Sequence, residues 1–448
     1  MAKKSALKYV CGNCGAISAS WTGRCQACGE WNSLTEQLDM AGGAAAKGGQ
    51  LLKVQSVTTA SLKQAGRLST KMGDVDLVLG GGLVAGSVSL LAGQPGIGKS
   101  TLLLQLAYHV AAGHRTLYVS GEESAQQIAL RAKRLGINHK NLQLATSTSA
   151  NDISATIASG EFDLVVVDSI QSIALEQISS AAGTVSQITN STQLLTAAAK
   201  QTNAALILVG HVTKEGSIAG PKVLEHVVDV VLQLEGDRYG GFKILRATKN
   251  RFGSTTEAAI LEMTEGGLEV VANPSAALLA ERQITDGSIV HATIEGTRPV
   301  LVEVQALVNR TSYGYPKRTA SGIDLNRVNL LVAMLERRTK LNLGDKDIYI
   351  NIVGGLRLTE PAADLAICMA IASADSGRQL KSNAAVFGEV GLSGEVRHVP
   401  QAEKRIAEAR KLGFEAAIGP AVRSGKKPAH LIGVSDVRSA LNQFLEKD

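Results

Sequence analysis

Two pairs of cysteines stand near the start of the chain, and their spacing is typical of a metal site. Cys11 and Cys14 form one CxxC pair, Cys25 and Cys28 form a second, and ten residues separate the pairs. Two such turns can present four thiolates to one zinc ion in a tetrahedron. A redox dithiol or a disulfide is the alternative, but no βαβ pattern and no secretory h-region accompany these cysteines. We therefore predict a zinc ribbon over residues 1–35.

A second motif is built to hold phosphate groups. The segment GQPGIGKST matches GxxxxGK[ST], and it lies between the apolar run SVSLLA and the amphipathic run TLLLQLAYHV. This strand–loop–helix order is what the chemistry requires: loop N–H groups surround phosphate, the lysine reaches the β- and γ-phosphates, and the next hydroxyl binds Mg²⁺. The motif predicts that ATP and Mg²⁺ bind at Gly93, Gln94, Pro95, Gly96, Ile97, Gly98, Lys99, Ser100 and Thr101.

Three further polar residues follow apolar runs and are candidates for the chemistry of hydrolysis. Asp168 ends LVVVD, where a carboxylate can hold the Mg²⁺ hydration shell, although it could instead cap a helix. Glu122 follows TLYVSG and is the best candidate to orient the attacking water, with Glu123 as a close competitor. His211 ends AALILVGH and could either sense the γ-phosphate or cap the strand edge. We predict Lys99, Glu122 and Asp168 as the catalytic set.

The elements that must position these residues form three domains. From residue 66 to residue 272, short β-branched runs alternate with amphipathic segments, which is typical of a parallel sheet covered by helices. The Gly/Ala-rich segment before it predicts a flexible linker over residues 36–65. Residues 273–285 are expected to form a second linker, and residues 286–448 to form an α+β domain. The expected fold class is α/β.

Composition excludes several classes of protein. The 448 residues carry 46 Lys and Arg against 40 Asp and Glu, so the net charge is +6, which is compatible with a polyanionic partner. Aromatic residues make up only 3%, so any nucleic-acid binding would depend mainly on Lys and Arg. No apolar run approaches the roughly 18 residues of a membrane span, and MAKKSALK lacks a following h-region. We expect a cytoplasmic protein with no membrane partner.

The order of these motifs resembles RecA-like P-loop ATPases. More narrowly, the run MGDVDLVLGGGLVAGSVSLLAGQPGIGKSTLLLQLA, the pentapeptide KNRFG at residues 249–253 and the four-cysteine ribbon together resemble the bacterial RadA/Sms family of recombination proteins. The resemblance spans essentially the whole chain. KNRFG is its most diagnostic element, because many families share a phosphate loop.

The resemblance implies a DNA-stimulated ATPase that acts in homologous recombination and DNA repair. It implies a homo-hexameric ring that moves on DNA and extends or branch-migrates recombination intermediates, with single-stranded and branched DNA and the RecA recombinase as partners. It also implies association with the nucleoid when the protein is engaged on DNA. Glu122 falls where the catalytic glutamate of RecA-like ATPases lies, and Asp168 falls at their second metal motif.

The pentapeptide contains two cations, Lys249 and Arg251, in a turn that Gly253 closes. These cations could reach the γ-phosphate bound by a neighbouring subunit or a DNA phosphate, and we predict that they contribute to nucleotide binding. The alternative from the residues alone is a solvated basic turn. The resemblance favours the first interpretation.

The C-terminal domain resembles the proteolytic domain of Lon, but both catalytic positions differ. Where that family has a serine after proline, Ala362 follows Pro361, and Glu403 stands at the position of the activating lysine. Lys404 is adjacent but points about 100° away on a helix. Without a nucleophile, peptidase activity is not expected. The alternative functions are an ATP-dependent Lon-like protease and a RecA-like signalling ATPase without motor activity.

Overall fold

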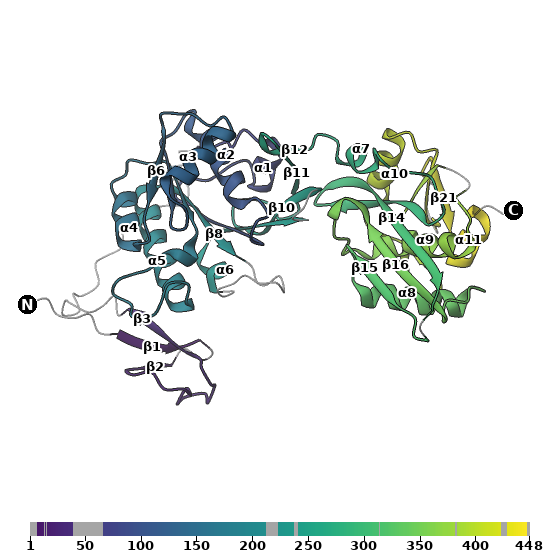
Figure 1. Ribbon diagram of the computed structural model, residues 1–448, viewed down its shortest axis with the longest axis horizontal. Helices are drawn as coiled ribbons and strands as arrows, with labels where there is room; N and C mark the ends of the chain where they lie inside the picture. The colour runs from purple at the N-terminus through teal and green to yellow at the C-terminus, as the bar shows by residue number, and fades with distance from the viewer. Residues whose placement is uncertain are drawn as a thin grey trace, which may run out of the picture. The chain divides into compact units, whose positions relative to one another are not determined.

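The computed structural model describes residues 7–12, 14, 16–38, 66–211, 223–236, 241–312, 314–380, 383–422 and 428–445 (Figure 1). It divides into two compact units. The first contains Met1–Glu235 and Lys243–Val270, and the second contains Gly236–Phe242 and Val271–Asp448. Most of the predicted first linker, residues 39–65, lies outside the described residues.

The N-terminal module is a small antiparallel sheet with strand order β2-β1-β3. Its strands are β1 (Leu7–Cys11), β2 (Ile17–Ser18) and β3 (Leu34–Leu38). The apolar cluster inside it consists of Cys11, Cys25 and Leu34, with Tyr9 and Ala16 packed against it. So small a core cannot stabilise a fold of this size without a further cross-link such as a metal.

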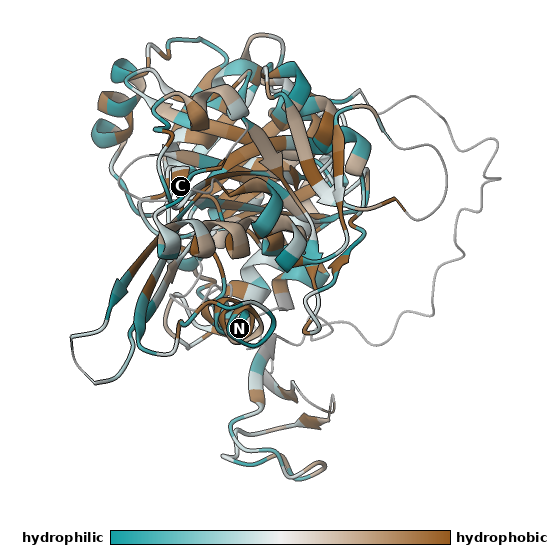
Figure 2. Ribbon diagram, turned by 90° about the vertical axis from the view of Figure 1, so that its right-hand side faces the viewer, coloured by the Kyte–Doolittle hydropathy of each residue, from teal (hydrophilic) through white to brown (hydrophobic). Residues whose placement is uncertain are grey.

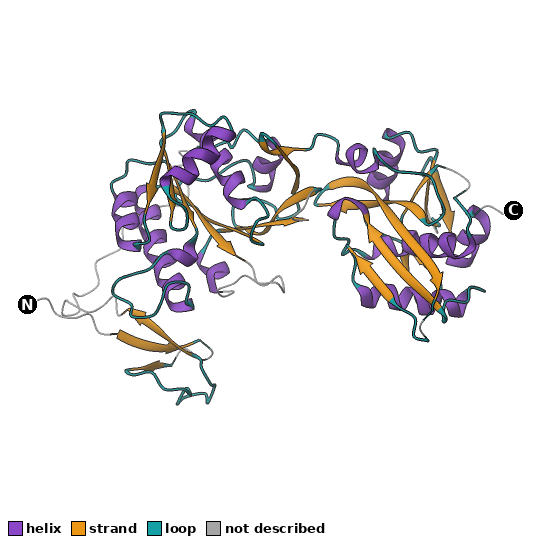
Figure 3. Ribbon diagram, viewed as in Figure 1, coloured by secondary structure: helices purple, strands orange, loops and turns teal. Residues whose placement is uncertain are grey.

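A nine-stranded sheet with the order β12-β11-β10-β9-β4-β8-β7-β5-β6 forms the centre of the first unit (Figure 3). From β9 to β6 neighbouring strands run parallel. This confirms the predicted α/β class with a parallel sheet. The strands are β4 (Val88–Gly93), β5 (Thr116–Ser120), β6 (Leu142–Thr146), β7 (Leu164–Asp168), β8 (Ala205–His211), β9 (Val230–Gly236), β10 (Phe242–Asn250), β11 (Ala258–Thr264) and β12 (Gly267–Val270).

Helices cover both faces of this sheet, and strand β7 shows why. All five of its residues are buried; Leu164 and Val166 belong to one apolar cluster, and Val165 and Val167 belong to another. Figure 2 shows this apolar character in the strands. A strand buried on both faces needs helices above and below. They are α1 (Gly73–Val78), α2 (Lys99–Ala111), α3 (Ala125–Arg134), α4 (Ala150–Ala158), α5 (Val185–Thr202) and α6 (Val223–Val227), with the 3-10 turn η1 (Ile170–Ser172).

Local sequence explains where these helices begin. Ser124 and Gln127 form a capping box at the start of α3, and the Thr184 hydroxyl accepts a hydrogen bond from the Gln187 N–H at the start of α5. Such caps satisfy N–H groups that lack partners within the helix. They fix the loops that leave the carboxyl ends of β5 and β7.

The second unit holds a seven-stranded mixed sheet of order β15-β16-β14-β13-β17-β20-β21 and a two-stranded ladder of β18 and β19. The strands are β13 (Ser288–Glu295), β14 (Arg298–Arg310), β15 (Arg318–Ser321), β16 (Lys346–Ile352), β17 (Ala384–Val386), β18 (Glu389–Val390), β19 (Val396–Arg397), β20 (Ala416–Pro420) and β21 (Leu431–Val434). The helices are α7 (Pro274–Leu279), α8 (Leu325–Arg338), α9 (Asp364–Ser376), α10 (Ala402–Lys411) and α11 (Val437–Phe444), with the 3-10 turns η2 (Val353–Gly355) and η3 (Pro361–Ala363).

Both predicted linkers need correction. Strand β3 continues to Leu38, past the expected boundary at residue 35, because Glu36 is buried against α5. The expected linker at residues 273–285 contains helix α7, which Asn273 caps and which buries Leu278 against the second unit. Among the described residues, no helix is long and apolar enough to cross a bilayer.

Candidate functional site

The phosphate loop joins the buried strand β4 to helix α2, as its sequence predicts. Helix α2 begins at Lys99 directly after Gly98, which takes the left-handed φ of 113°. A Cβ atom on Gly93 would lie 2.7 Å from the carbonyl oxygen of Leu234 on β9. Glycine at both positions therefore lets the loop turn tightly beside the neighbouring strand. Gln94, Pro95 and Gly96 are exposed, so the loop amides face solvent at the helix N-terminus.

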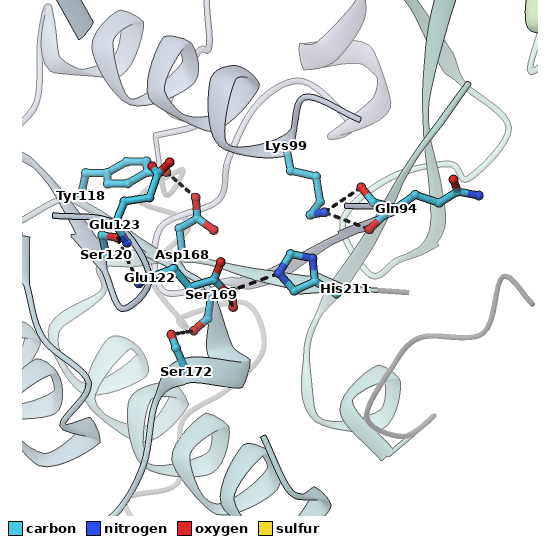
Figure 4. A network of polar contacts seen from close by, with 11 residues as sticks. Gln94, Lys99, Tyr118, Ser120, Glu122, Glu123, Asp168, Ser169, Ser172 and His211 are labelled. Atoms are coloured by element: carbon cyan, nitrogen blue, oxygen red, sulfur yellow. Dashed lines mark hydrogen bonds and ion pairs between the residues drawn. The ribbon is translucent and has the colours of Figure 1, made fainter. Parts of the chain in front are cut away.

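The side chain of Lys99 lies along this loop and is only 5% exposed. Its Nζ donates hydrogen bonds to the carbonyl oxygens of Gly93, at 2.9 Å, and Gln94, at 3.0 Å (Figure 4). Burial lowers the pKa of Lys99, and the negative charges of Asp168 and Glu122 oppose that shift. The ammonium group is therefore held beside two carboxylates and the loop carbonyls.

Parallel register brings the other predicted residues to the same edge of the sheet. Gly93 pairs with His211, and Ser120 pairs with Asp168, so β4, β8, β5 and β7 all end at this level. Asp168 is 7% exposed, and its Oδ2 accepts a 2.6 Å hydrogen bond from the hydroxyl of Tyr118. Ligand sites of open α/β sheets lie at such carboxyl edges.

The structure separates Glu122 from Glu123, which the sequence leaves open. Oε1 of Glu122 accepts a hydrogen bond from the hydroxyl of Ser169 and lies 3.3 Å from Nε2 of His211. Glu123 instead pairs with Arg131 of α3, with 2.5 Å between Oε1 and Nη2. Only Glu122 therefore lies among the groups at the end of β7 and β8 (Figure 4). A carboxylate in this position can orient a water molecule and accept its proton.

The four cysteines meet in the N-terminal module, with their Sγ atoms within 4.8 Å of one another. Sγ of Cys11 lies 3.6 Å from Sγ of Cys28, and Sγ of Cys14 lies 3.7 Å from Sγ of Cys25. Four sulfurs at tetrahedral positions around zinc would be roughly 3.8 Å apart, given Zn–S bonds of about 2.3 Å. None of the four forms a disulfide. The geometry therefore fits a tetrathiolate zinc site.

KNRFG lies at the opposite edge of the nine-stranded sheet from the phosphate loop of its own chain. Lys249 is the next-to-last residue of strand β10 rather than part of a turn. Its Nζ donates to the carbonyl oxygens of Glu225, at 2.5 Å, and Val228, at 2.8 Å. Arg251 pairs at 3.0 Å with Asp229, whose Oδ2 accepts from the N–H of Val88 at the start of β4. Strand β4 separates the two edges by roughly 16 Å, so neither cation contacts its own chain's phosphate loop.

In the second unit, the positions that resemble a protease site are closed by other interactions. Ala362 is 2% exposed, while Glu403 lies exposed on α10. The neighbouring Glu360 accepts two hydrogen bonds from Arg405, at 2.8 Å and 2.6 Å. Lys404 points elsewhere and donates to the carbonyl oxygen of Thr297 at 3.1 Å. No described residue supplies a hydroxyl at position 362 or an amine at position 403.

Comparisons with known proteins match three regions of the chain, namely the N-terminal module, the domain of the phosphate loop and the second unit. Residues 9–36 match a family model described as a rubredoxin metal binding domain, residues 56–217 match an AAA domain, and residues 326–422 match subunit ChlI of Mg-chelatase. The chain is also similar to three proteins named DNA repair protein RadA. The Bacillus subtilis protein is 47% identical, and the alignment covers 99% of both chains.

The chain belongs to the RadA family. The Halalkalibacterium halodurans relative is 46% identical over 99% of this chain and all of its own length, and the Escherichia coli relative is 44% identical over 99% of both. The RadA resemblance of the sequence is thereby confirmed, together with the fold class of zinc ribbon, RecA-like ATPase core and Lon-like C-terminal domain.

Two polar contacts were not expected from the sequence, one at the end of the sheet and one between the N-terminal module and α5. Tyr118 lies within the apolar run TLYVS, where alternation alone predicts a core residue, yet its hydroxyl reaches Asp168. Burial raises the pKa of Tyr118 well above its usual range, and the charge of Asp168 raises it further. The burial of Glu36 was also not expected. Its carbonyl oxygen accepts a hydrogen bond from the hydroxyl of Ser186, and its carboxylate accepts one from the hydroxyl of Ser179 at 3.2 Å. A single charged residue in the polar segment SLTEQLD carries no sequence signal for such burial.

Proposed function

We propose that this protein is a DNA-dependent ATPase of homologous recombination and repair. In this proposal a homo-hexameric ring uses ATP hydrolysis to move on single-stranded and branched DNA, where it extends or branch-migrates intermediates alongside RecA in the nucleoid. The carboxyl edge of the ATPase sheet carries the proposal, because Lys99, Glu122 and Asp168 converge beside the phosphate loop there. The relatives named DNA repair protein RadA support the choice of DNA as partner.

The residues divide the work of hydrolysis. Amides of the loop bind the phosphates, and Nζ of Lys99 leaves its carbonyl partners to neutralise charge on the transferred group. The Ser100 hydroxyl and the Asp168 carboxylate are oxygen ligands suited to Mg²⁺, which when bound would neutralise charge on the phosphate oxygens. Glu122 orients the attacking water and receives its proton, while His211 lies close enough to respond to that change of charge.

The two edges of the sheet suggest how subunits cooperate. The phosphate loop lies at the carboxyl edge and KNRFG at the amino edge, so head-to-tail packing would bring the pentapeptide of one subunit to the loop of the next. Head-to-tail interfaces close into rings when the rotation between subunits permits. We infer that Lys249 and Arg251 act in trans on nucleotide, after exchanging their present partners Glu225, Val228 and Asp229.

A mixing experiment tests this assignment. Lys249→Ala should retain nucleotide binding but lose DNA-stimulated hydrolysis, and Lys99→Ala should lose hydrolysis altogether. Rings that contain both mutant subunits have some interfaces with both halves intact, so mixtures should recover part of the activity. If native mass spectrometry detects mixed rings that stay inactive, the pentapeptide acts within its own chain, where it holds the start of β9 to β10.

Zinc is the second cofactor of the proposal, bound once per chain by Cys11, Cys14, Cys25 and Cys28. Cys28→Ala should unfold the ribbon and leave the ATPase core folded, because the metal supplies most of the ribbon's stability. Both tryptophans of the chain, Trp21 and Trp31, lie in the ribbon and report its state by fluorescence. Metal analysis that finds no zinc in protein purified without chelator would contradict this assignment.

A further inference from the structure

Tyr118 stands in the middle of strand β5, where it pairs with Val166 of β7, two residues before the end of that strand. It is 1% exposed and belongs to the apolar cluster that includes Leu102 and Val166. A phenol hydroxyl in such surroundings needs a hydrogen-bond partner. It donates to Oδ2 of Asp168 at 2.6 Å, a carboxylate that is itself 7% exposed. The aspartate at the carboxyl edge is therefore held from inside the core.

Strand β7 returns the same kind of contact to β5. The Ser169 hydroxyl, which follows Asp168, donates to Oε1 of Glu122, which follows β5. Each of the two neighbouring strands thus supplies a hydroxyl for the other's carboxylate (Figure 4). The Ser172 hydroxyl, which donates to the Ser169 carbonyl at 2.7 Å, lies against Gly121, where any Cβ atom would be 2.2 Å from it.

The hydrogen bond from Tyr118 makes the two carboxylate oxygens of Asp168 different. Oδ2 already accepts the tyrosine hydroxyl, so Oδ1 has more capacity for a cation or for a water molecule of its hydration shell. A donor behind a metal-binding carboxylate fixes the plane of the carboxylate and its charge. Neutral hydroxyl donors do this without adding a positive charge that would repel the cation.

We propose that Tyr118 is a positioning residue for the divalent cation of the phosphate loop, acting through Asp168. The proposal rests on the proposed ATPase function, and it adds a residue of the β5 core to the machinery. Tyr118→Phe keeps the ring and removes one oxygen atom, so it isolates the hydrogen bond from the packing.

The test measures binding rather than turnover. Binding of a fluorescent ADP analogue is titrated with Mg²⁺, without DNA, for the wild-type protein, Tyr118→Phe and the control Tyr108→Phe on α2. We expect the half-saturating Mg²⁺ concentration to rise roughly tenfold in Tyr118→Phe, as for other outer partners of metal ligands. Nucleotide affinity at saturating Mg²⁺ should change less than twofold, and Tyr108→Phe should behave as wild type. An unchanged Mg²⁺ dependence in folded Tyr118→Phe would overturn the proposal.

A double-mutant cycle covers the case in which packing alone is disturbed. In an Asp168→Asn background, Tyr118→Phe should cause no further change in the half-saturating Mg²⁺ concentration, because the carboxylate it positions is gone. An additive change would assign the tyrosine a purely structural role. A wild-type protein that binds nucleotide without any dependence on Mg²⁺ would instead contradict the proposed ATPase site itself, so the two failures are distinguishable.

Discussion

The carboxyl edge of the ATPase sheet and the protease-like site of the second unit both gather charged side chains, but they neutralise them differently. At the ATPase edge, Asp168 and Glu122 receive hydrogen bonds from the hydroxyls of Tyr118 and Ser169. In the second unit, Glu360 receives a hydroxyl hydrogen bond from Thr293, but both of its oxygens also accept from the buried guanidinium of Arg405.

From this difference we infer that the first site can bind a charged ligand and that the second is structural. Carboxylates held by neutral hydroxyls keep their negative charge available for a cation, and Lys99 is held by carbonyls that a phosphate can replace. The charge of a carboxylate that pairs with a bidentate arginine is already neutralised within the fold, so it is not available to a ligand. The arrangement of partners, rather than the number of charges, marks the functional site.

The largest effect is expected from the loss of the Lys99 ammonium group at the carboxyl edge. Lys99→Ala should lower kcat for ATP hydrolysis at least about 100-fold, because it removes a charge that stabilises the transition state in a buried position. Phosphate release is the measurement, and Lys133→Ala on the exposed side of α3 is the matched control. Activity close to wild type in Lys99→Ala would remove the phosphate loop from the mechanism.

The next largest effect is expected when the ion pair of Glu360 and Arg405 in the second unit is broken. Glu360→Gln should lower the free energy of unfolding of the second unit by about 3 kcal/mol, because it leaves the Arg405 guanidinium buried without its counter-ion. Urea denaturation measures this loss. The control Glu403→Gln, on the exposed face of α10, should stay within about 0.5 kcal/mol of wild type. Equal losses in the two variants would contradict the distinction.

The same pair makes a prediction about pH. Burial alone would raise the pKa of Glu360, but the hydrogen bonds and charge of Arg405 hold it well below its usual range. A depressed carboxyl pKa contributes stability above the unfolded value of about 4.3 and loses it as pH falls toward the folded value. The stability difference between wild type and Glu360→Gln should therefore be constant from pH 7 to pH 5 and shrink below about pH 4. A difference that grows on acidification would contradict this pairing.

The smallest effect is expected when a serine is introduced at the protease-like site of the second unit. Ala362→Ser should confer no peptide cleavage, because Glu403 supplies no amine base and Arg405 is committed to Glu360. The buried hydroxyl should cost about 1 kcal/mol of stability, since position 362 is only 2% exposed. A fluorogenic peptide assay and thermal denaturation measure the two outcomes. Cleavage that survives repurification would show that this site is catalytic after all.

Much of the ATPase edge could be predicted because its residues sit at the ends of strongly apolar strands. The ends of LVVVD and AALILVGH are fixed by their pattern, and parallel strands bring their carboxyl ends together. The choice between Glu122 and Glu123 could not be made, since adjacent residues of a turn point in different directions. In the structure Arg131, eight residues beyond Glu123, pairs with Glu123 and so favours Glu122, and that pairing depends on where α3 packs.

Two other features differ in how strongly the sequence indicates them. Helix α7 has a clear sequence signal, and the contact of Tyr118 with Asp168 has none. Asn273 and Pro274 are a typical helix start, with an N-cap residue and proline at the first position, so α7 could have been recognised within the presumed linker. Tyr118 gives no such signal. Its role depends on the register of β5 against β7, which alternation of apolar residues does not specify.

We propose that the carboxyl edge hydrolyses ATP and that DNA controls the rate. The most direct measurement is steady-state ATP turnover by the full chain with and without single-stranded DNA, using Lys99→Ala as the blank. We predict turnover that depends on Lys99, requires Mg²⁺ and rises severalfold when DNA is added. Turnover that is the same with and without DNA, or that persists in Lys99→Ala, would contradict the proposed DNA-dependent ATPase.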